Sequence, residues 1–329
     1  MRVTFYLRRP QSSYFSIERI FSDLRRALPK SIDIKEAVSR FPSRGVLGRI
    51  YNVIEAVFRQ GDVNHITGDV HYLALLLRKK RTLLTIHDLV VVHRLNGWKR
   101  VLVIIFWYWL PIKRSALVSV ISESTKVDLL RHINVAPEKI RVIHDCVSCD
   151  FQHTPKEFNT LLPVILQIGT GQNKNIERLA EALEGIPCHL RIVGLLSEKQ
   201  ETTLRKYGVR YSFVSNISDN QIVEEYRGCD MLVFASTYEG FGLPIVEAQA
   251  IGRPVVTSNI LSMPEVSGGA ACLVDPFDMK SIREGILKVI KVDSFRNELV
   301  RSGIENVVQF RPDIIAAKYA NIYRELLEC

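Results

Sequence analysis

The residues from Met231 to Asp275, MLVFASTYEGFGLPIVEAQAIGRPVVTSNILSMPEVSGGAACLVD, decide the fold of this chain. The segment opens with a short apolar run, Met231 to Ala235, which is typical of a buried parallel strand. A polar, glycine-bearing turn follows, and a helix is predicted to begin at Leu243-Pro244, because a first helical turn tolerates proline. The helix should end near Gly252, just before the next apolar run. The segment therefore predicts a strand–turn–helix–strand unit of an α/β sheet.

Such a unit places backbone N–H groups and the positive end of a helix dipole at the carboxyl edge of a parallel sheet. Open α/β sheets bind their ligands at that edge. Glu239 stands just before the predicted helix, and Glu247 lies inside it. Carboxylates accept hydrogen bonds from sugar hydroxyls and helix-end amides bind phosphates, so the unit indicates a nucleotide-sugar site. The alternative is an ordinary crossover whose two glutamates lie on solvated helix faces.

These two glutamates resemble a known motif. Glu239 and Glu247, with seven residues between them around Gly240-Phe241-Gly242-Leu243-Pro244, are similar to the E-x7-E motif of retaining glycosyltransferases of family 4. The GRPVV run and Pro264-Glu265 extend the resemblance. The resemblance implies the GT-B fold, an α/β architecture of two Rossmann-like, doubly wound parallel-sheet domains facing a central cleft. It also implies sugar transfer from a nucleoside diphosphate donor with retention of anomeric configuration.

The length of 329 residues is enough for two domains. The alternation of strands and helices over 164–290 predicts a doubly wound parallel sheet. We expect residues 1–150 to form an N-terminal acceptor-binding domain and residues 151–310 a C-terminal nucleotide-sugar-binding domain. The resemblance implies that residues 311–329 form a C-terminal helix that crosses back to the N-terminal domain.

The resemblance assigns roles to residues of the donor side. Glu239, as a catalytic residue, is expected to contact the donor sugar, the amides of Gly242 and Leu243 the sugar and phosphate, and Glu247 the ribose hydroxyls. A second loop, Gly169 to Asn175, feeds a predicted helix and fits the general design of an anion site. Its lysine can reach the diphosphate as a mobile point charge. The predicted donor-binding residues are Gly171, Lys174, Glu239, Gly240, Phe241, Gly242, Leu243 and Glu247.

A histidine marks the other side of the predicted site. The apolar strand Leu83 to Ile86 ends at His87, and the resemblance implies that this histidine is catalytic and contacts the donor sugar. A histidine at a strand end can equally be structural. His65 is a second candidate at another strand end. The loop after the first strand lacks the glycines that many family members carry there, and only Arg8, Arg9, Ser12 and Ser13 could supply donors.

The charge is unevenly distributed. Residues 1–150 carry 25 Lys and Arg against 13 Asp and Glu, a net +12, while the rest of the chain is at −3. A basic first half suggests an anionic partner such as nucleic acid, a membrane surface or a phosphorylated substrate, although solubility alone could explain an excess. We expect no signal peptide in the first residues, because Arg8-Arg9-Pro10 interrupts a short apolar run. We therefore expect a cytoplasmic protein.

One apolar segment suggests a membrane. Val101 to Ile112 is too short to span a bilayer, so a buried helix is the simplest interpretation. However, Trp107, Tyr108 and Trp109 between flanking cations are typical of interfacial helices. We expect the first half to contact an anionic membrane peripherally, on the inner face of the cytoplasmic membrane.

No metal site or bound cofactor is expected beyond the nucleotide-sugar co-substrate. The C-x2-C spacing of Cys146 and Cys149 lacks enough neighbouring ligands for zinc, and the six cysteines are expected to be reduced. Cations and helix-end amides can stabilise a leaving diphosphate without a metal ion.

The sequence thus predicts a retaining, metal-independent hexosyltransferase that moves a sugar from a nucleotide sugar, GDP-mannose or a UDP-sugar, to a glycan or lipid-linked acceptor in polysaccharide biosynthesis. A nucleotide-sugar epimerase of the same architecture is an alternative. A nucleic-acid-binding protein is a remote one, since only the basic pI supports it and no nucleic-acid module is recognisable. The sequence does not decide between front-face attack and a covalent intermediate.

Overall fold

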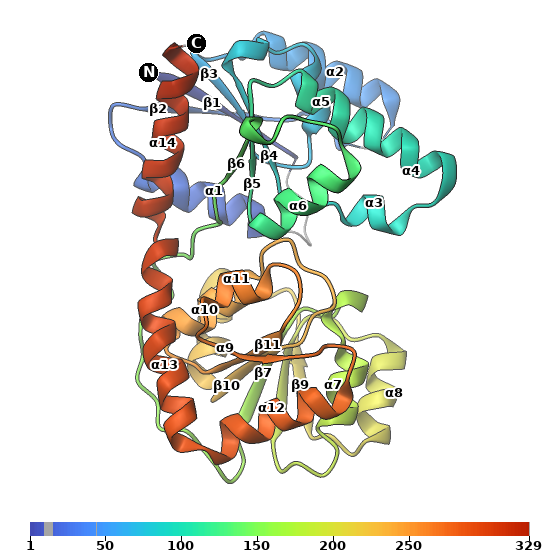
Figure 1. Ribbon diagram of the computed structural model, residues 1–329, viewed down its shortest axis with the longest axis vertical. Helices are drawn as coiled ribbons and strands as arrows, with labels where there is room; N and C mark the ends of the chain where they lie inside the picture. The colour runs from blue at the N-terminus through green and yellow to red at the C-terminus, as the bar shows by residue number, and fades with distance from the viewer. Residues whose placement is uncertain (10–15, 44, 329) are drawn as a thin grey trace. The chain divides into compact units, whose positions relative to one another are not determined.

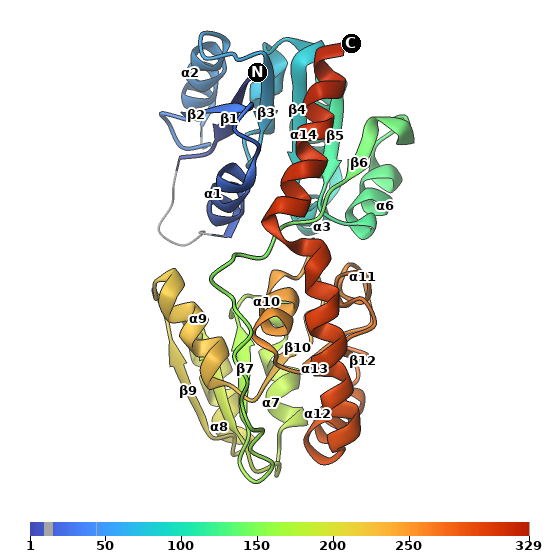
Figure 2. The same ribbon diagram turned by 90° about the vertical axis from the view of Figure 1, so that its left-hand side faces the viewer.

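The computed structural model describes residues 1–9, 16–43 and 45–328 (Figure 1). The chain divides into two compact units. Unit 1 comprises Met1–Cys146 together with Pro312–Cys329, and unit 2 comprises Val147–Arg311. Each unit contains a six-stranded sheet with every recorded strand pair parallel, and helices pack on the sheet (Figures 1 and 2). The predicted α/β class of two Rossmann-like, parallel-sheet domains is confirmed.

The sheet of unit 1 has the strand order β2-β1-β3-β4-β5-β6. Apolar and small side chains fill its inner strands because both faces of a parallel sheet are covered. The elements of this unit in chain order are β1 (Arg2–Leu7), α1 (Ser16–Ala27), β2 (Asp33–Val38), α2 (Val46–Val57), β3 (Val63–Ile66), η1 (His71–Leu75), η2 (Lys79–Arg81), β4 (Thr82–Ile86), α3 (Val90–Arg94), α4 (Gly97–Val103), η3 (Ile104–Trp109), α5 (Leu110–Lys113), β5 (Leu117–Val120), α6 (Glu123–His132), η4 (Pro137–Lys139), β6 (Ile140–Val142) and α14 (Pro312–Glu328).

Strand periodicity divides unit 1 into two packed faces. Tyr6 of β1 and Ile66 of β3 are register partners and belong to one apolar cluster, which α2, η3 and α6 help to close. Their neighbours Phe5 and His65, also register partners, belong to the opposite face. There the ring of Phe5 lies against Phe21 of α1 and against Tyr323 of α14.

The C-terminal helix α14 is part of unit 1 (Figure 2). Tyr323 donates to or accepts from His65 Nδ1 at 2.8 Å, deep in the sheet face. At the far end of the helix, the guanidinium of Arg81 donates to the backbone oxygen of Leu326 at 2.5 Å. Arg141 and Glu325 form an exposed ion pair at 2.9 Å. The last helix is therefore fastened to elements that precede it by about 180 residues or more.

The sheet of unit 2 has the order β12-β11-β10-β7-β8-β9, with β10 and β7 at its centre. Ser197 and Ser218 begin α8 and α9 with complete capping boxes, which explains where these helices start. The elements in chain order are β7 (Val164–Ile168), η5 (Gln172–Lys174), α7 (Ile176–Ala182), β8 (His189–Val193), α8 (Glu198–Lys206), β9 (Tyr211–Val214), α9 (Asp219–Gly228), β10 (Met231–Phe234), α10 (Leu243–Ile251), β11 (Val255–Ser258), α11 (Met263–Ser267), β12 (Cys272–Val274), α12 (Met279–Lys291), α13 (Asp293–Val307) and η6 (Val308–Phe310).

The predicted strand–turn–helix–strand segment forms the centre of this unit. Strand β10 is fully buried, and α10 begins at Leu243 with proline in its first turn, as the sequence predicts. The helix ends at Gly252, which has a φ of 86°, a left-handed cap that glycine adopts without strain. Because seven of the nine residues of α10 are buried, this helix lies in the core and not on a solvated face.

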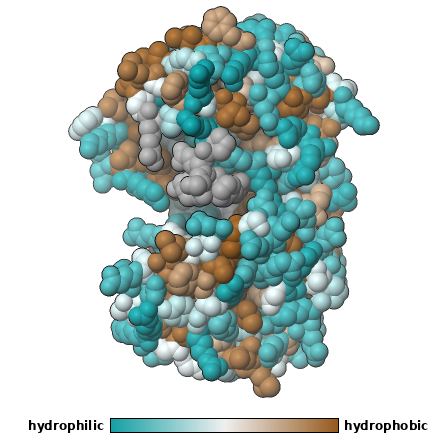
Figure 3. All heavy atoms as spheres, turned by 180° about the vertical axis from the view of Figure 1, so that it is seen from behind, coloured by the Kyte–Doolittle hydropathy of each residue, from teal (hydrophilic) through white to brown (hydrophobic). Residues whose placement is uncertain are grey.

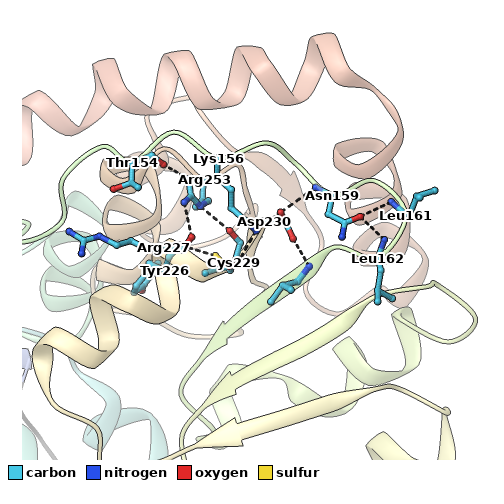
Figure 4. Close-up of polar contacts among 12 residues, drawn as sticks. Thr154, Lys156, Asn159, Leu161, Leu162, Tyr226, Arg227, Cys229, Asp230 and Arg253 are labelled. Carbon is cyan, nitrogen blue, oxygen red and sulfur yellow. Dashed lines mark hydrogen bonds and ion pairs between the residues drawn. The ribbon is translucent and has the colours of Figure 1, made fainter.

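Residues 151–162 of unit 2 have no regular secondary structure, and side chains of the same unit hold this segment in place (Figure 4). Asp230 accepts from Lys156 Nζ at 2.5 Å and from the amides of Asn159 and Val164. Arg253 donates to the backbone oxygens of Thr154, Arg227 and Cys229 at 2.8–2.9 Å. Because of these contacts, unit 2 begins at Val147 and includes the segment.

The residues after Gly68 form only the short 3-10 turns η1 and η2. One predicted feature of unit 1 differs in the structure. The helix over Val101 to Ile112 forms, but it is interrupted by the π-helical turn η3 and only Tyr108, Pro111 and Ile112 are buried, so it is not a buried core helix. None of the helices that the structure describes has the length and hydropathy needed to cross a lipid bilayer.

Candidate active site

The donor-side candidates of unit 2 meet at the carboxyl ends of β7 and β10. Lys174 Nζ lies 2.6 Å from Glu239 Oε1, and both side chains are less than a fifth exposed. Asn173 Nδ2 donates to the same oxygen at 3.1 Å and to the backbone oxygen of Tyr238 at 2.9 Å. The Thr237 amide returns a bond to the Asn173 carbonyl at 2.8 Å. Two loops that are separated by about 65 residues are thereby joined around one carboxylate.

The position of Lys174 follows from its neighbours. Its ammonium lies 4.4 Å from the centre of the Phe234 ring at the end of β10, a cation–π contact. Gly169 has a φ of 83°, and a Cβ there would lie 2.9 Å from Lys174 Cε. Only glycine therefore lets the stem of the lysine pass over the loop without a clash. Gly171 precedes η5, and its carbonyl accepts from the Lys174 amide at 2.8 Å.

The start of α10 supplies amides beside this pair. Gly242 is the residue before the helix, with a φ of 101°, and its carbonyl accepts from Ile245 at 2.9 Å. Ser262 Oγ donates to the backbone oxygens of Glu239 at 3.1 Å and Phe241 at 2.8 Å. The two Ser262 bonds therefore hold the turn that presents Glu239. The amides of Gly242 and Leu243 lie at the positive end of the helix dipole, where anions are stabilised.

Glu247 lies one turn into α10 and is 8% exposed. Its Oε2 accepts from the hydroxyl of Tyr226 at 2.6 Å, and Tyr226 is fully buried against Phe151. A carboxylate with one rigid donor has a fixed orientation. The structure thus shows Glu247 as a buried, oriented acceptor, and its predicted contact with a ribose remains a prediction.

His87 belongs to unit 1 and follows β4 directly. It is 7% exposed, and its Nε2 lies 2.9 Å from the carbonyl oxygen of Thr67. Since a carbonyl only accepts, Nε2 carries the proton and Nδ1 is the acceptor nitrogen. The ring also contacts Phe21 edge-on at 6.0 Å. His87 is therefore an imidazole whose ring orientation is fixed through Nε2, and its catalytic role remains a prediction.

His65, the second histidine candidate, is a core residue, and its prediction as a site residue is wrong. Its side chain is fully buried, with Nδ1 2.8 Å from Tyr323 Oη and Nε2 2.7 Å from Thr85 Oγ1. Thr85 in turn contacts Ser119 Oγ at 2.6 Å. Burial, with a smaller contribution from His87, lowers the pKa of His65 to about 3. The residue holds α14 to the sheet.

The arginines that could share the phosphate charge are engaged elsewhere. Arg8 pairs with Glu18 at 2.6 Å and Asp69 at 3.3 Å, and Arg9 donates to the Arg40 carbonyl at 3.3 Å. Arg253 is 3% exposed and donates its guanidinium hydrogens to backbone oxygens. Ser12 and Ser13 lie outside the described residues. Lys174 is thus the cation that the structure places beside Glu239.

Two family models match the chain. The model described as Glycosyltransferase Family 4 covers residues 21–151, and the model described as Glycosyl transferases group 1 covers residues 150–306. This chain belongs to the family 4-type glycosyltransferases. It thus carries the family's two modules in the order expected from the sequence.

Curated relatives of this glycosyltransferase include two O-antigen enzymes. It is 28% identical to the O-antigen chain mannosyltransferase B of Escherichia coli, over 64% of this chain and 61% of that one. It is 26% identical to the O-antigen chain mannosyltransferase RfbU of Salmonella typhimurium, over 73% of this chain and 70% of that one. The match spans about a quarter of the length of the E. coli serotype-specific mannosyltransferase WbdA.

Solved structures share the fold of this glycosyltransferase. Anabaena HepE, determined in complex with UDP and glucose, has a TM-score of 0.79 at 16% identity, covering 99% of this chain and 100% of that one. WaaG, a glycosyltransferase involved in lipopolysaccharide biosynthesis, has a TM-score of 0.72 at 16% identity, covering 98% and 99%. At such identities the likeness establishes the GT-B fold.

Sequence reasoning on this glycosyltransferase missed several supporting residues. Asn173, Tyr226 and Ser262 orient the predicted site residues, yet they carry no motif of their own. Asn173 could have been suspected from its position in the glycine-rich loop. Tyr226 could not, because it reaches Glu247 from another helix across 21 residues.

The surface of unit 1 also carries a feature that the sequence indicated only in part, through the segment Val101 to Ile112. Helix α2 exposes a row of large apolar side chains, of which Leu47 and Phe58, just after the helix, are each 83% exposed. Trp98 and Phe106 on α4 and η3 are 69% and 59% exposed. Figure 3 shows hydrophobic side chains gathered along the upper edge of this unit, on the side of α2. We call the two rows the apolar rim; its exposed members are Val46, Leu47, Ile50, Tyr51, Ile54, Phe58, Trp98, Val101, Leu102, Ile105, Phe106 and Trp109.

A cavity of about 530 Å³ opens beside the apolar rim. Its walls come from α2, through Arg49, and from α4 and η3, through Leu102, Val103, Phe106 and Trp107. The Arg49 guanidinium lies 5.0 Å from the centre of the Trp107 ring. Asp88, the residue after His87, also lines the cavity. An amphiphilic ligand fits such a lining, because apolar walls surround one cation and two carboxylates, Asp69 and Asp88.

Proposed function

We propose that this protein is a retaining glycosyltransferase that moves a sugar from a nucleoside diphosphate sugar to a glycan or lipid-linked acceptor in polysaccharide biosynthesis. The observation that carries the proposal is the Lys174–Glu239 pair, 2.6 Å apart beside the first amides of α10. A cation, helix-end amides and a carboxylate in one place match the diphosphate and the hydroxyls of a nucleotide sugar.

In the proposed donor complex, the Lys174 ammonium leaves the Glu239 carboxylate and pairs with the diphosphate. The lysine and the amides of Gly242 and Leu243 then neutralise the charge that develops on the leaving diphosphate. Glu239, relieved of the lysine, accepts from hydroxyls of the sugar. Glu247, oriented by Tyr226, accepts from the ribose hydroxyls. No divalent cation is required in this scheme, which makes the proposed reaction metal-independent.

The proposed role of His87 is to contact the donor sugar through Nδ1. Its Nε2 proton is held by the Thr67 carbonyl, so the ring cannot rotate without losing that bond. Retention of configuration would arise by attack of the acceptor hydroxyl on the same face that the diphosphate leaves. A carboxylate nucleophile on the opposite face would produce the same outcome through a covalent intermediate, and trapping the intermediate distinguishes the two routes.

The names of the relatives bear on the donor. The mannosyltransferases among them favour a mannose donor, for which GDP-mannose is our candidate, and the structure with UDP and glucose favours a UDP-sugar. A panel of radiolabelled nucleotide sugars, with a short mannan or a lipid-linked oligosaccharide as acceptor, tests the proposal. Transfer in the presence of EDTA, with NMR showing the donor's anomeric configuration in the product, is expected. Release of a C2-epimeric nucleotide sugar without transfer would identify an epimerase instead.

We further propose that the acceptor is reached at an anionic membrane, on the inner face of the cytoplasmic membrane. The apolar rim provides exposed tryptophan and aliphatic side chains, and α4 adds Lys99 and Arg100 without any acidic residue. Such a combination is typical of surfaces that lie in a bilayer interface. The cavity beside the rim would receive the part of the acceptor next to its lipid.

A further inference from the structure

A cluster of metal-binding side chains lies in unit 1, outside the predicted site. His93 of α3, Asp128 and His132 of α6 each offer one ligand atom, and all three atoms lie within 4.8 Å of one another. His93 Nε2 is 2.7 Å from Asp128 Oδ2, and His132 Nδ1 is 3.4 Å from Asp128 Oδ1. We propose that this His-Asp-His cluster binds one Zn²⁺ ion.

The geometry is close to that of a metal site. In a tetrahedral zinc site with bonds of about 2.1 Å, neighbouring ligand atoms are about 3.4 Å apart. The ligand atoms of the cluster therefore need to move by little more than an ångström. Asp128 and His132 are four residues apart on α6, so the helix itself places them on one face. His93 arrives from α3 with its ring 5.3 Å from that of His132.

The surroundings of the cluster support the assignment. The Asp128 carbonyl oxygen lies 2.8 Å from His132 Nδ1 and accepts its proton, which leaves Nε2 of His132 as the nitrogen for the ion. A metal-bound imidazole normally donates its other N–H in this way. Solvent can reach the cluster, since the His93 side chain is 39% exposed while Asp128 and His132 are 15% and 16% exposed. Three protein ligands leave a fourth position for water.

The ligand types select the metal. Two imidazoles and one carboxylate suit zinc, whereas Mg²⁺ takes oxygen ligands almost exclusively. Because α3 begins two residues after Asp88, whose Oδ1 accepts from the Val90 amide at 2.9 Å, the ion would fasten the segment after His87 to α6.

Binding is measured on the full chain by equilibrium dialysis with Zn²⁺, in a Cys149→Ser background that removes the one thiol classed as exposed within residues 1–9, 16–43 and 45–328. One ion per chain is expected, and a tenfold excess of Mg²⁺ should not displace it. His93→Gln, His132→Gln and Asp128→Asn should each weaken binding at least tenfold. His153→Gln, an exposed histidine of unit 2, is the matched control and should bind as the background does.

Thermal unfolding provides a second measurement that needs neither donor nor acceptor. At a zinc concentration 100-fold above Kd, the transition of the parent chain should rise by about 5 to 10 °C, and that of the variants should not. Absence of saturable binding in the parent, or equal affinity in the parent and all three variants, overturns the proposal and leaves a hydrogen-bonded trio. If one variant fails to fold by circular dichroism, the other two decide.

Discussion

Lys174 Nζ and Glu239 Oε1, which come from the ends of β7 and β10, lie 2.6 Å apart with Asn173 as a second donor to the same oxygen. The ion pair engages the charged groups of both side chains. A diphosphate that takes the lysine must break this ion pair. The pair therefore sets a cost on donor binding and, at the same time, keeps both side chains in place for the ligand.

Changing Lys174 to Ala should abolish most transfer while leaving the melting temperature within about 2 °C of wild type, because the lysine lies in a loop outside the core and Asn173 still donates to Glu239. Steady-state kinetics over a range of donor concentrations check the first expectation. Lys199→Ala, which removes the exposed Lys199–Glu177 pair, is the matched control and should be active. Normal turnover of the Lys174 variant at saturating donor would place the phosphate charge elsewhere.

Glu247→Ala should weaken binding of the nucleoside diphosphate about ten- to a hundredfold, since a charged hydrogen bond contributes about 1.5–3 kcal/mol. Isothermal titration calorimetry of the folded variant measures the loss. Tyr226→Phe removes only the orienting hydroxyl and should weaken binding by a smaller factor. Undiminished nucleotide affinity in Glu247→Ala would contradict the ribose assignment.

The fully buried His65 predicts a pH dependence of stability. Its folded pKa of about 3 lies below the unfolded value of about 6.5, so the unfolded chain binds a proton that the native chain does not. Stability should be fully present above pH 6.5 and fall by up to about 1.4 kcal/mol per pH unit as the pH drops below it. Burial raises the pKa of Asp145, which acts in the opposite direction, so the two effects must be separated.

The variant His65→Asn separates the effect of His65 from that of Asp145. This variant should be less stable at neutral pH because it leaves partners unsatisfied, but its stability should decline less steeply between pH 6.5 and 5. Urea unfolding at several pH values gives both slopes. Parallel slopes for the two proteins would show that His65 does not titrate on unfolding.

Arg253→Lys should destabilise unit 2 without affecting the donor site directly. Lysine cannot supply the fork that serves the carbonyls of Thr154, Arg227 and Cys229, so we expect a loss of about 1–3 kcal/mol. Denaturant unfolding measures that loss. Nucleotide affinity of the folded variant should match wild type; a large decrease would indicate that the arginine serves the ligand after all.

Cosedimentation with liposomes tests the apolar rim. Wild type should bind vesicles that contain anionic lipid, and binding should weaken at high salt because screening removes the long-range attraction. Changing Leu47 and Phe58 together to Ser should reduce binding, and so should changing Trp98 and Phe106 to Ser. Leu161→Ser is the control, because Leu161 lies in unit 2 and is as exposed as Leu47; this variant should bind as wild type does. Equal binding to neutral and anionic vesicles, or binding to neither, would exclude electrostatic docking.

The central segment was predictable because its signals are local. An apolar run, a glycine-bearing turn and a proline in the first helical turn fix the bounds of β10 and α10 almost to the residue. The N-cap of α6 is a signal of the same local kind, since Ser122 accepts from the Thr125 amide at 3.0 Å. Lys174 and Glu239 could be nominated separately from their loops, but the sequence could not show that they touch.

Other features depend on long-range contacts and were not predictable. His65 and His87 both follow or end apolar strands, yet one is buried under α14 and the other faces a loop carbonyl. Helix α2 has the composition of a core helix, and its exposed row appears only when the sheet leaves one face of it uncovered. From the sequence alone, Arg253 could be taken for a cation available to a ligand. In the structure it donates to the segment before β7.

The return of α14 to unit 1 has a consequence for biosynthesis. The partner of His65 Nδ1 is Tyr323, so unit 1 lacks this bond until the last helix has left the ribosome. Translation of the whole of unit 2 intervenes, which takes about 10 to 30 s at 5–20 residues per second. During that interval the nascent chain carries an imidazole open to protonation and a sheet face without its cover. Chaperones would meet the unfinished domain at that face.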